Sequence, residues 1–283
     1  MSGAERPRTV LDKSEILEGL FASWDALDAL LAELSDDEWQ RPTSLPGWSV
    51  RDVVAHIVGT ELMLSGTPTP ESESEVTDRD HVRNEIGALN ERWIEHLRGE
   101  SPAALLARFR EVIAARKESL SAMGRKEWDA VGFTPAGPDS YGRFMRVRIF
   151  DCWMHEHDIR DALGRPPTDE HLAGADTRLS LDEMASSIAF VVGKKGRAPE
   201  GARVLIGLTG PVSREFRVAV DGRAALVEDF GGAEPTVAIT LDGLQFSRLC
   251  GGRPLLAERP RAIEVGGDRE AGERIVENLA YVI

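Results

Sequence analysis

Asp151 and His155 are the first candidates for chemistry, because they lie four residues apart in the stretch RIFDCWMHEHDIRDALGRP (residues 148–166). Apolar residues recur there close to a 3.6-residue period, and Gly164 followed by prolines is typical of a helix end. The pattern predicts a helix, on which residues four apart project from the same face. A carboxylate and an imidazole held in this way can supply two of the three protein ligands of a catalytic metal site with one open position.

His56 is the candidate for the third ligand. It lies in SVRDVVAHIVGTELML (residues 49–64), where Ser49 is a good helix N-cap and Asp52 stands at the third helical position. A single histidine in an apolar helix is more often a hydrogen-bonded core residue than a ligand. The separate carboxylate–histidine pair favours the ligand interpretation, and the core histidine stays open as the alternative.

The first part of the chain shows one amphipathic pattern after another. Helices are expected over residues 14–34, 49–64, 81–97, 101–123 and 141–163, with a short turn at 35–39. Residues 65–80 and 124–140 are expected to be loops, because they are rich in proline, glycine and polar residues, and the second could border a pocket. Successive helices indicate an antiparallel bundle, whose core can hold metal ligands from facing helices.

The pattern changes after Pro167. A helix is expected over residues 176–192, and strands follow at 203–209, 215–220, 225–228, 236–241 and 262–265, with helices at 244–249 and 269–281. Short strands mixed with helices predict a small α+β domain. We expect a boundary near residues 165–175, with a helical domain over 1–168 and the α+β domain over 169–283.

Composition limits the possible partners. The net charge is −14 and no cluster of Lys or Arg stands out, so nucleic-acid binding is not expected. The chain has no apolar run of about 18 residues and no signal-peptide core at its start, which predicts no membrane partner and a cytoplasmic protein. Cys152 and Cys250 are the only cysteines, which argues against a disulfide framework. We expect a monomer or a weak homodimer.

Two segments carry a family resemblance: LPGWSVRDVVAH (residues 45–56) and DCWMHEHD (residues 151–158). They resemble the mycothiol-dependent maleylpyruvate isomerase family, and the likeness covers nearly the whole chain. It implies a DinB-like metal-binding four-helix bundle followed by an α+β domain like sterol carrier protein. The family's metal ligands fall on His56, Asp151 and His155, with Asp in place of the usual Glu.

The resemblance also implies further residues and a reaction. Asp158 matches the family's acidic residue and would orient a ligand or cap a helix. Arg253, in a Gly-Arg pair shared with the family, could bind a substrate carboxylate if it faces the bundle; the alternative is an exposed arginine. A divalent metal, most simply Zn²⁺, would turn the thiol of mycothiol into a nucleophilic thiolate that adds to a small electrophile. Addition followed by elimination gives cis–trans isomerisation, and addition alone gives S-transfer.

Other functions use the same residues. A metal-bound water in place of the thiol would make the protein a hydrolase, and a fully occupied metal would make it a non-catalytic ligand-binding protein. Cys152 is interpreted as a small buried hydrophobe rather than a nucleophile. Asp151 could instead pair with Arg148 or Arg146. The remaining histidines and Glu156 are not expected to bind the metal: His157 lies about 200° around the helix from His155, Glu156 is expected to be solvated or paired, and His81 and His96 are interpreted as surface residues.

Overall fold

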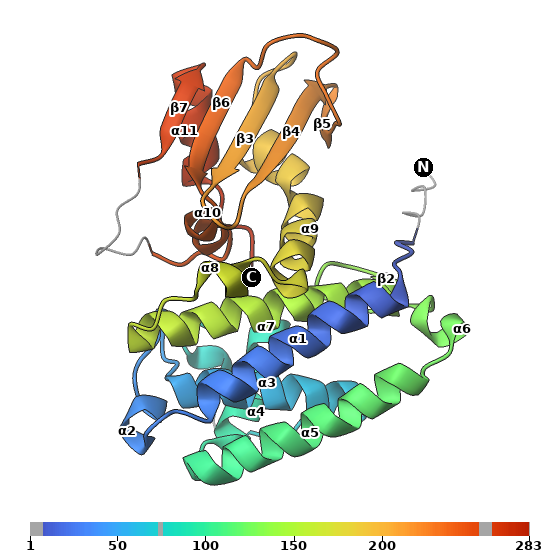
Figure 1. Cartoon of the computed structure of the whole chain (residues 1–283), viewed down its shortest axis with the longest axis vertical. Helices are drawn as coiled ribbons and strands as arrows, with labels where there is room; N and C mark the ends of the chain where they lie inside the picture. The colour runs from blue at the N-terminus through green and yellow to red at the C-terminus, as the bar shows by residue number, and fades with distance from the viewer. Residues whose placement is uncertain (1–7, 73–75, 255–261, 283) are drawn as a thin grey trace. The chain divides into compact units, whose positions relative to one another are not determined.

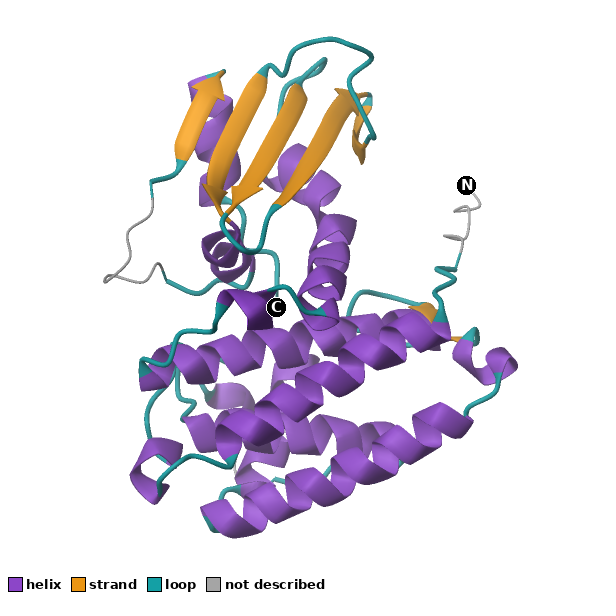
Figure 2. Ribbon diagram, in the orientation of Figure 1, coloured by secondary structure: helices purple, strands orange, loops and turns teal. Residues whose placement is uncertain are grey.

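The computed structural model describes residues 8–72, 76–254 and 262–282. The chain divides into two compact units, one formed by residues up to Pro167 together with Gly174–Ser180, and one formed by Thr168–Ala173 together with the residues from Leu181 onward. The first unit is helical and the second combines helices with a five-stranded sheet (Figures 1 and 2). The predicted fold class is therefore confirmed.

Four long helices build the first unit (Figure 1): α1 (Lys13–Leu31), α3 (Val50–Leu64), α5 (Pro102–Ala122) and α7 (Tyr141–Leu163). Helix α1 packs against α5 and α7, and α3 packs against α5, α7 and the shorter α4 (Glu85–Leu97). The helix-forming pattern places large apolar side chains between them. The fully buried members of this core include Trp24, Leu27, Ile57, Ile94 and Phe109.

Side-chain caps fix where these helices begin. Ser49 and Asp52 form a reciprocal capping box at the start of α3, as their spacing predicted. Ser140 accepts a hydrogen bond from the backbone N–H of Arg143 at the start of α7. Helix α4 begins at Glu85, four residues later than expected, because Asn84 caps it through the backbone N–H of Gly87.

The two segments expected to be loops contain short regular elements. The first holds the 3₁₀ turn η1 (Val76–Asp78); the second holds helix α6 (Arg125–Trp128) and the paired strands β1 (Val131–Gly132) and β2 (Asp139–Ser140). The loop prediction was therefore wrong at these places. Trp128 explains α6, because its indole is fully buried and donates to the backbone carbonyl of Leu11 at 3.2 Å. The expected short turn at 35–39 is helix α2 (Asp36–Trp39).

The second unit is built on one mixed sheet with strand order β5-β4-β3-β6-β7 (Figure 2). β3 and β6 are parallel and the other neighbours are antiparallel. Helix α10 packs against β3 and β6, and α11 against β6 and β7. Its strands are β3 (Arg203–Thr209), β4 (Arg214–Asp221), β5 (Arg223–Leu226), β6 (Val237–Asp242) and β7 (Glu264–Gly267), and its helical elements include α8 (Asp169–Leu172), η2 (Val191–Lys195), α10 (Gly243–Cys250) and α11 (Arg269–Glu277). Helix α9 (Ala175–Phe190) has residues in both units.

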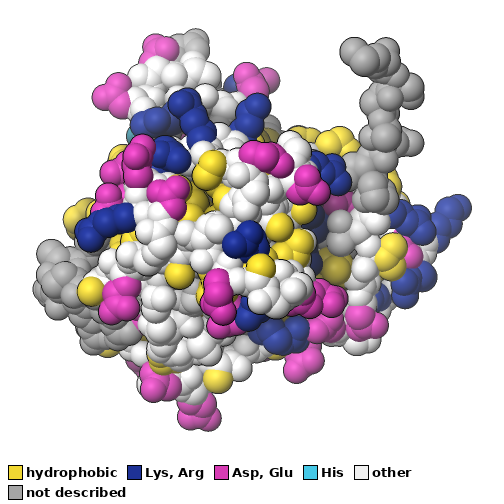
Figure 3. All heavy atoms as spheres, turned by 90° about the horizontal axis from the view of Figure 1, so that it is seen from above, with side chains coloured by type: hydrophobic (Ala, Val, Ile, Leu, Met, Phe, Trp, Pro, Cys, Tyr) yellow, Lys and Arg dark blue, Asp and Glu magenta, His cyan; other side chains and the backbone are white. Residues whose placement is uncertain are grey.

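The surface agrees with the charge pattern of the sequence. Basic and acidic side chains are interspersed on the face drawn in Figure 3. Among the described residues, no helix combines the length and the apolar character needed to cross a bilayer. Both cysteines are free and buried.

Candidate metal centre

Helices α3 and α7 bring the three predicted ligands together. His56 Nε2 lies 3.3 Å from Asp151 Oδ2, and His155 Nε2 lies 3.5 Å from Asp151 Oδ1. The two imidazole rings meet edge to face, with their centroids 4.9 Å apart. One ligand atom from each residue lies within 4.8 Å of the other two. The sequence-predicted set is therefore assembled in space, and its binding of a metal stays a prediction.

The donor set fits a divalent ion of the zinc type. Two ligand atoms that are each about 2.0–2.1 Å from one tetrahedral ion lie about 3.3–3.4 Å apart, which is close to the separations of the two imidazole nitrogens from Asp151. Burial lowers the pKa of His56, although Asp151 opposes the shift, so this imidazole favours the neutral form that binds metals. Two imidazoles and one carboxylate suit zinc and similar ions.

The pKa values of Asp151 and His155 shift in opposite directions in this environment. Burial alone would raise the pKa of Asp151, but the charges of Arg148, His155 and His56 outweigh it and hold that pKa well below its usual value. Burial alone would lower the pKa of His155, but Asp151 and Asp158 outweigh it and raise that pKa. A metal ion at His155 therefore competes with protonation of this imidazole.

Asp158 has the geometry of the orienting residue that the resemblance implied. Its Oδ2 lies 3.1 Å from His155 Nδ1, one turn along α7. A carboxylate on one imidazole nitrogen holds a proton there and leaves the other nitrogen free to bind an ion. Because Nε2 is the nitrogen that faces Asp151, the hydrogen bond presents the correct side of His155.

Arg148 connects the centre to a buried ionic network. Its guanidinium donates to Asp151, as the alternative interpretation of Asp151 expected, and to Glu61 Oε1 at 2.8 Å. Arg116 donates to the other Glu61 oxygen at 2.9 Å and to the Tyr141 hydroxyl at 3.0 Å. Glu61 is completely buried. One carboxylate thus joins two arginines, and one of those arginines restrains a candidate ligand.

Glu61 and Arg116 were missed in the sequence, although a signal was present. Glu61 comes four residues after Ile57 on the apolar stripe of its helix, where a charged side chain must be buried. Arg116 likewise follows Val112 and Ile113 on the buried side of α5. Charged residues on an apolar stripe indicate a buried ion pair, because an unpaired buried charge is costly.

The other residues of the motif lie outside the candidate centre. The Cys152 thiol is fully buried and burial raises its pKa to about 12, which supports its interpretation as a buried hydrophobe. His157 packs edge to face on Trp153, with ring centroids 4.2 Å apart. Glu156 is completely buried and pairs with Arg160 at 2.6 Å. The expectation that Glu156 is paired was correct, and the expectation that it is solvated was wrong.

Arg253 belongs to the second unit, just after α10. Its guanidinium donates to the Gly251 carbonyl oxygen at 2.6 Å, and the residue is only 9% exposed. The interpretation as a solvent-exposed arginine is therefore wrong, and the carboxylate-binding role stays a prediction.

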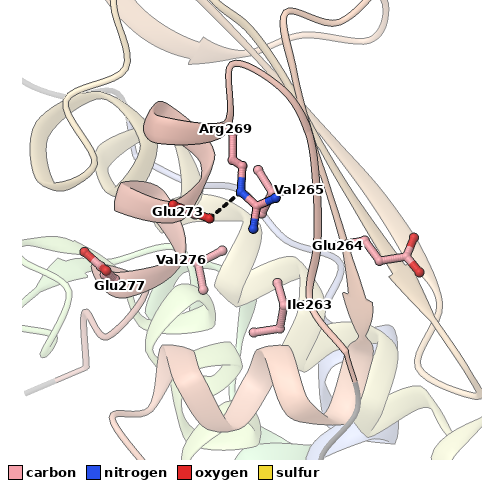
Figure 4. Close-up of a pocket in the computed structure, with 7 residues that line it drawn as sticks. All are labelled: Ile263, Glu264, Val265, Arg269, Glu273, Val276 and Glu277. Carbon is pink, nitrogen blue, oxygen red and sulfur yellow. Dashed lines mark hydrogen bonds and ion pairs between the residues drawn. The ribbon is translucent and has the colours of Figure 1, made fainter.

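A separate pocket of about 480 Å³ lies between β7 and α11 of the second unit (Figure 4). Its lining mixes apolar side chains with carboxylates and includes the Arg269–Glu273 ion pair. None of the candidate ligands contributes to it, and neither does Arg253. The pocket and the candidate metal centre are therefore different features of the molecule.

Comparison with known proteins agrees with these observations. Residues 20–160 match the family model of the mycothiol maleylpyruvate isomerase N-terminal domain, and residues 178–274 match the MDMPI C-terminal domain. The chain belongs to the mycothiol-dependent maleylpyruvate isomerase family, as its two motifs predicted. An uncharacterised protein of Mycobacterium tuberculosis, found in strains H37Rv and CDC 1551, is 31% identical over 205 residues, which cover 71% of this chain and 75% of that protein.

Two solved structures share the fold. The crystal structure of the mycothiol-dependent maleylpyruvate isomerase is 17% identical, covers 90% of this chain and 93% of that chain, and has a TM-score of 0.59. A histidine-to-alanine mutant of the same enzyme is 16% identical, with 86% and 90% covered and a TM-score of 0.57. At this identity, the likeness establishes a common fold.

Proposed function

We propose that the protein is a divalent-metal-dependent enzyme that uses mycothiol either to isomerise a small electrophile or to form an S-conjugate with it by thiolate addition. The observation that carries the proposal is the assembled set of His56, Asp151 and His155. The two histidine side chains are 6% and 8% exposed, whereas the Asp151 side chain is 29% exposed. Solvent and small molecules thus reach the set from the carboxylate side, which is the property expected of a site with an open position. Membership of the family, and the activity for which its solved member is named, support mycothiol as the thiol.

The chain's own residues would prepare this site before any substrate arrives. A divalent ion held by the three ligands supplies positive charge that lowers the pKa of a bound thiol. Asp158 fixes the proton on His155 Nδ1, so that Nε2 points to the centre. Arg148 keeps Asp151 ionised and restrains its rotation. Since these groups are already oriented by buried partners, little reorganisation is needed during the reaction.

Arg253 is included as the proposed binding group for a substrate carboxylate. Its support is chemical: a planar guanidinium with several N–H donors can bind a carboxylate through two parallel hydrogen bonds. Arg253→Ala is then expected to raise KM for an anionic substrate and to leave the metal content unchanged. If the kinetics with the anionic substrate are the same as those of the wild type, Arg253 has no part in substrate binding.

The deciding experiment measures metal content together with thiol-dependent turnover of an electrophile. The wild type is expected to hold one metal per chain and to turn over only with mycothiol present. His56→Ala and His155→Ala are each expected to lose the metal and the activity, and His96→Ala is the control histidine outside the set. Stoichiometric metal in both ligand variants would refute the ligand assignment. Metal-dependent turnover without any thiol would indicate a hydrolase.

A further inference from the structure

Trp48 lies directly over the two candidate histidine ligands. Its ring centroid is 5.3 Å from that of His56 and 6.0 Å from that of His155, with the planes tilted by 39° and 34°. The residue immediately precedes Ser49, the N-cap of the helix that carries His56. A partly buried indole thus borders the two histidines of the candidate centre.

Glu91 holds the indole through its N–H group. Its Oε1 accepts the Trp48 Nε1–H at 2.6 Å and also lies 2.8 Å from His81 Nε2. Its Oε2 pairs with the guanidinium of Arg79, which also pairs with Glu95. Glu91 is 1% exposed, and a carboxylate is buried at this depth only when donors satisfy it. The His81 side chain is 24% exposed, so His81 lies partly at the surface, as expected, and it also contacts this buried carboxylate.

The backbone around Trp48 is fixed as firmly as the side chain. The Trp48 carbonyl oxygen accepts hydrogen bonds from both the backbone N–H and the hydroxyl of Thr43, each at 2.9 Å. Gly47 has a φ of +79°, and a Cβ there would lie 2.9 Å from His81 Cε1. Any other residue at position 47 would therefore be strained and would collide with the His81 ring.

A second glycine brings Glu91 within reach. A Cβ on Gly59 of α3 would lie 2.4 Å from the Cβ of Trp93 on α4. The missing side chain lets the two helices approach, and α4 then carries Glu91 to the Trp48 indole. The ring packs against the hydrophobic core and is also held by its own loop and by a neighbouring helix.

We propose that Trp48 is a specificity-determining residue that walls the reaction chamber beside the metal centre, and that Glu91 is the positioning residue that fixes its ring. This inference rests on the proposed function. Aromatic rings prefer offset or edge-to-face contact with other flat π systems, so the wall selects flat, conjugated electrophiles over saturated ones of the same size. Glu91 acts through the indole and does not touch the substrate.

The hydrogen bond between Trp48 and Glu91 can be tested by NMR, without measuring enzyme activity. Trp48→Phe keeps the ring and removes the N–H, so the indole N–H signal that it loses in the NMR spectrum belongs to Trp48. Glu91→Gln is expected to shift that signal strongly, because the acceptor loses its charge. The matched control is Glu95→Gln, which removes a carboxylate from the same helix and the same Arg79 but does not reach Trp48; it should leave the signal in place.

Binding of Co²⁺ then separates this inference from the proposed function. Paramagnetic Co²⁺ added to the purified, metal-stripped wild type should bind stoichiometrically and shift or broaden the Trp48 indole signal. If Co²⁺ does not bind, the proposed function is refuted, and the proposed role of Trp48 is refuted with it. If Co²⁺ binds and the Trp48 signal does not change, the wall alone is refuted.

Kinetics with mycothiol test specificity. Trp48→Leu and Glu91→Gln are each expected to lower kcat/KM for a flat, conjugated electrophile about tenfold or more, with a smaller loss for a saturated halide and unchanged Co²⁺ affinity. In the Trp48→Leu background, Glu91→Gln should add less than about a threefold further loss, because it acts through the indole. Equal losses for both substrates, or a full additional loss in the double variant, would overturn the proposal. If Glu91→Gln does not fold, the comparison of substrates with Trp48→Leu decides.

Discussion

The first unit buries a network of charges, whereas the central strands of the second unit bury apolar side chains. Glu61, Arg116 and Arg148 are each no more than 3% exposed. Both arginines pair with Glu61, which joins α3 to α5 and α7. On β3 and β4, by contrast, every buried position is apolar, from Val204 to Val220. An apolar core needs little more than the right volume, while a buried charge needs one particular partner in one geometry. The residues whose identity and geometry tolerate the least change therefore lie on the helices that carry the candidate metal centre.

The same contrast distinguishes two kinds of glutamate in the first unit. Glu61 and Glu91 are buried and each meets at least two cationic or N–H donors. Glu118, on the outer side of α5, is exposed. Only the buried carboxylates are linked to the candidate centre, Glu61 through Arg148 and Glu91 through Trp48. Substitution of either glutamate therefore tests whether the buried charges support the candidate centre.

The largest effect is expected from Glu61→Ala. The substitution leaves two buried guanidiniums without the carboxylate that they share, and breaking a buried ion pair from one side costs about 3–5 kcal/mol of unfolding free energy. Urea denaturation measures the loss without adding salt. Glu118→Ala is the matched control and should change stability by no more than about 0.5 kcal/mol. A similar small change in Glu61→Ala would show that the network contributes nothing to the stability of the bundle.

An intermediate effect is expected at Asp139, where the start of the described chain is bound. Thr9 donates its backbone N–H to Oδ1 at 2.6 Å and its hydroxyl to Oδ2 at 2.8 Å. Burial alone would raise the pKa of Asp139, but the hydrogen bonds from Thr9 and Ser140 and the charge of Arg143 outweigh it and lower the pKa. The native state therefore holds the charged form more strongly than the unfolded chain does. The resulting stability is present above the ordinary aspartate pKa and is lost as the pH falls through the lowered native value.

Asp139→Asn is thus expected to lower stability by about 1.5–3 kcal/mol at neutral pH, the range for hydrogen bonds to a charged group. The difference from the wild type should begin to shrink below about pH 4, near the ordinary aspartate pKa, and should be lost as the pH falls through the lowered native pKa of Asp139. Thermal melts at a series of pH values measure this. Thr9→Val removes the hydroxyl donor and should lower stability by a smaller amount, with the same dependence on pH. A difference that stays constant into acid would exclude the charge as its cause.

The smallest effect is expected from an apolar change in the second unit. Ile239 lies in the middle of β6 and is 1% exposed. Ile239→Val removes one buried methylene and should cost about 0.5–1.5 kcal/mol, with no change between acid and neutral pH. Thr240→Ser on the less buried face of the same strand is the control, with an expected change within about 0.5 kcal/mol. A pH-dependent loss of stability in Ile239→Val would contradict the distinction between the buried charge network and the apolar strands.

The long helices and the ligand set could be predicted because they depend on local rules. Helix α7 runs from Tyr141 to Leu163, in agreement with the predicted range of about 141–163, because a capping serine and Gly164 enclose it. Asp151 and His155 face the same side because any helix places residues four apart in that way. His56 could be added because a separate carboxylate–histidine pair was present in the sequence and the family motif matched.

The supporting contacts could not be predicted, because they depend on which helices become neighbours. Glu91 is far from Trp48 along the chain, and only the close approach of α3 and α4 at Gly59 brings them together. The short helix α6 has four residues, too few to form a periodic pattern, and exists because Trp128 is buried. Both cases are tertiary effects that no window of sequence contains.

The two cysteines give each unit its own reporter of opening. Cys152 belongs to the first unit and Cys250 to the second, and both thiols are fully buried. A thiol reagent can reach each sulfur only during a local or global opening, so the two labelling rates measure the opening free energies of the two units separately. The natural chain can therefore show, without engineered labels, whether a metal ion or a thiol stabilises one half of the protein or both.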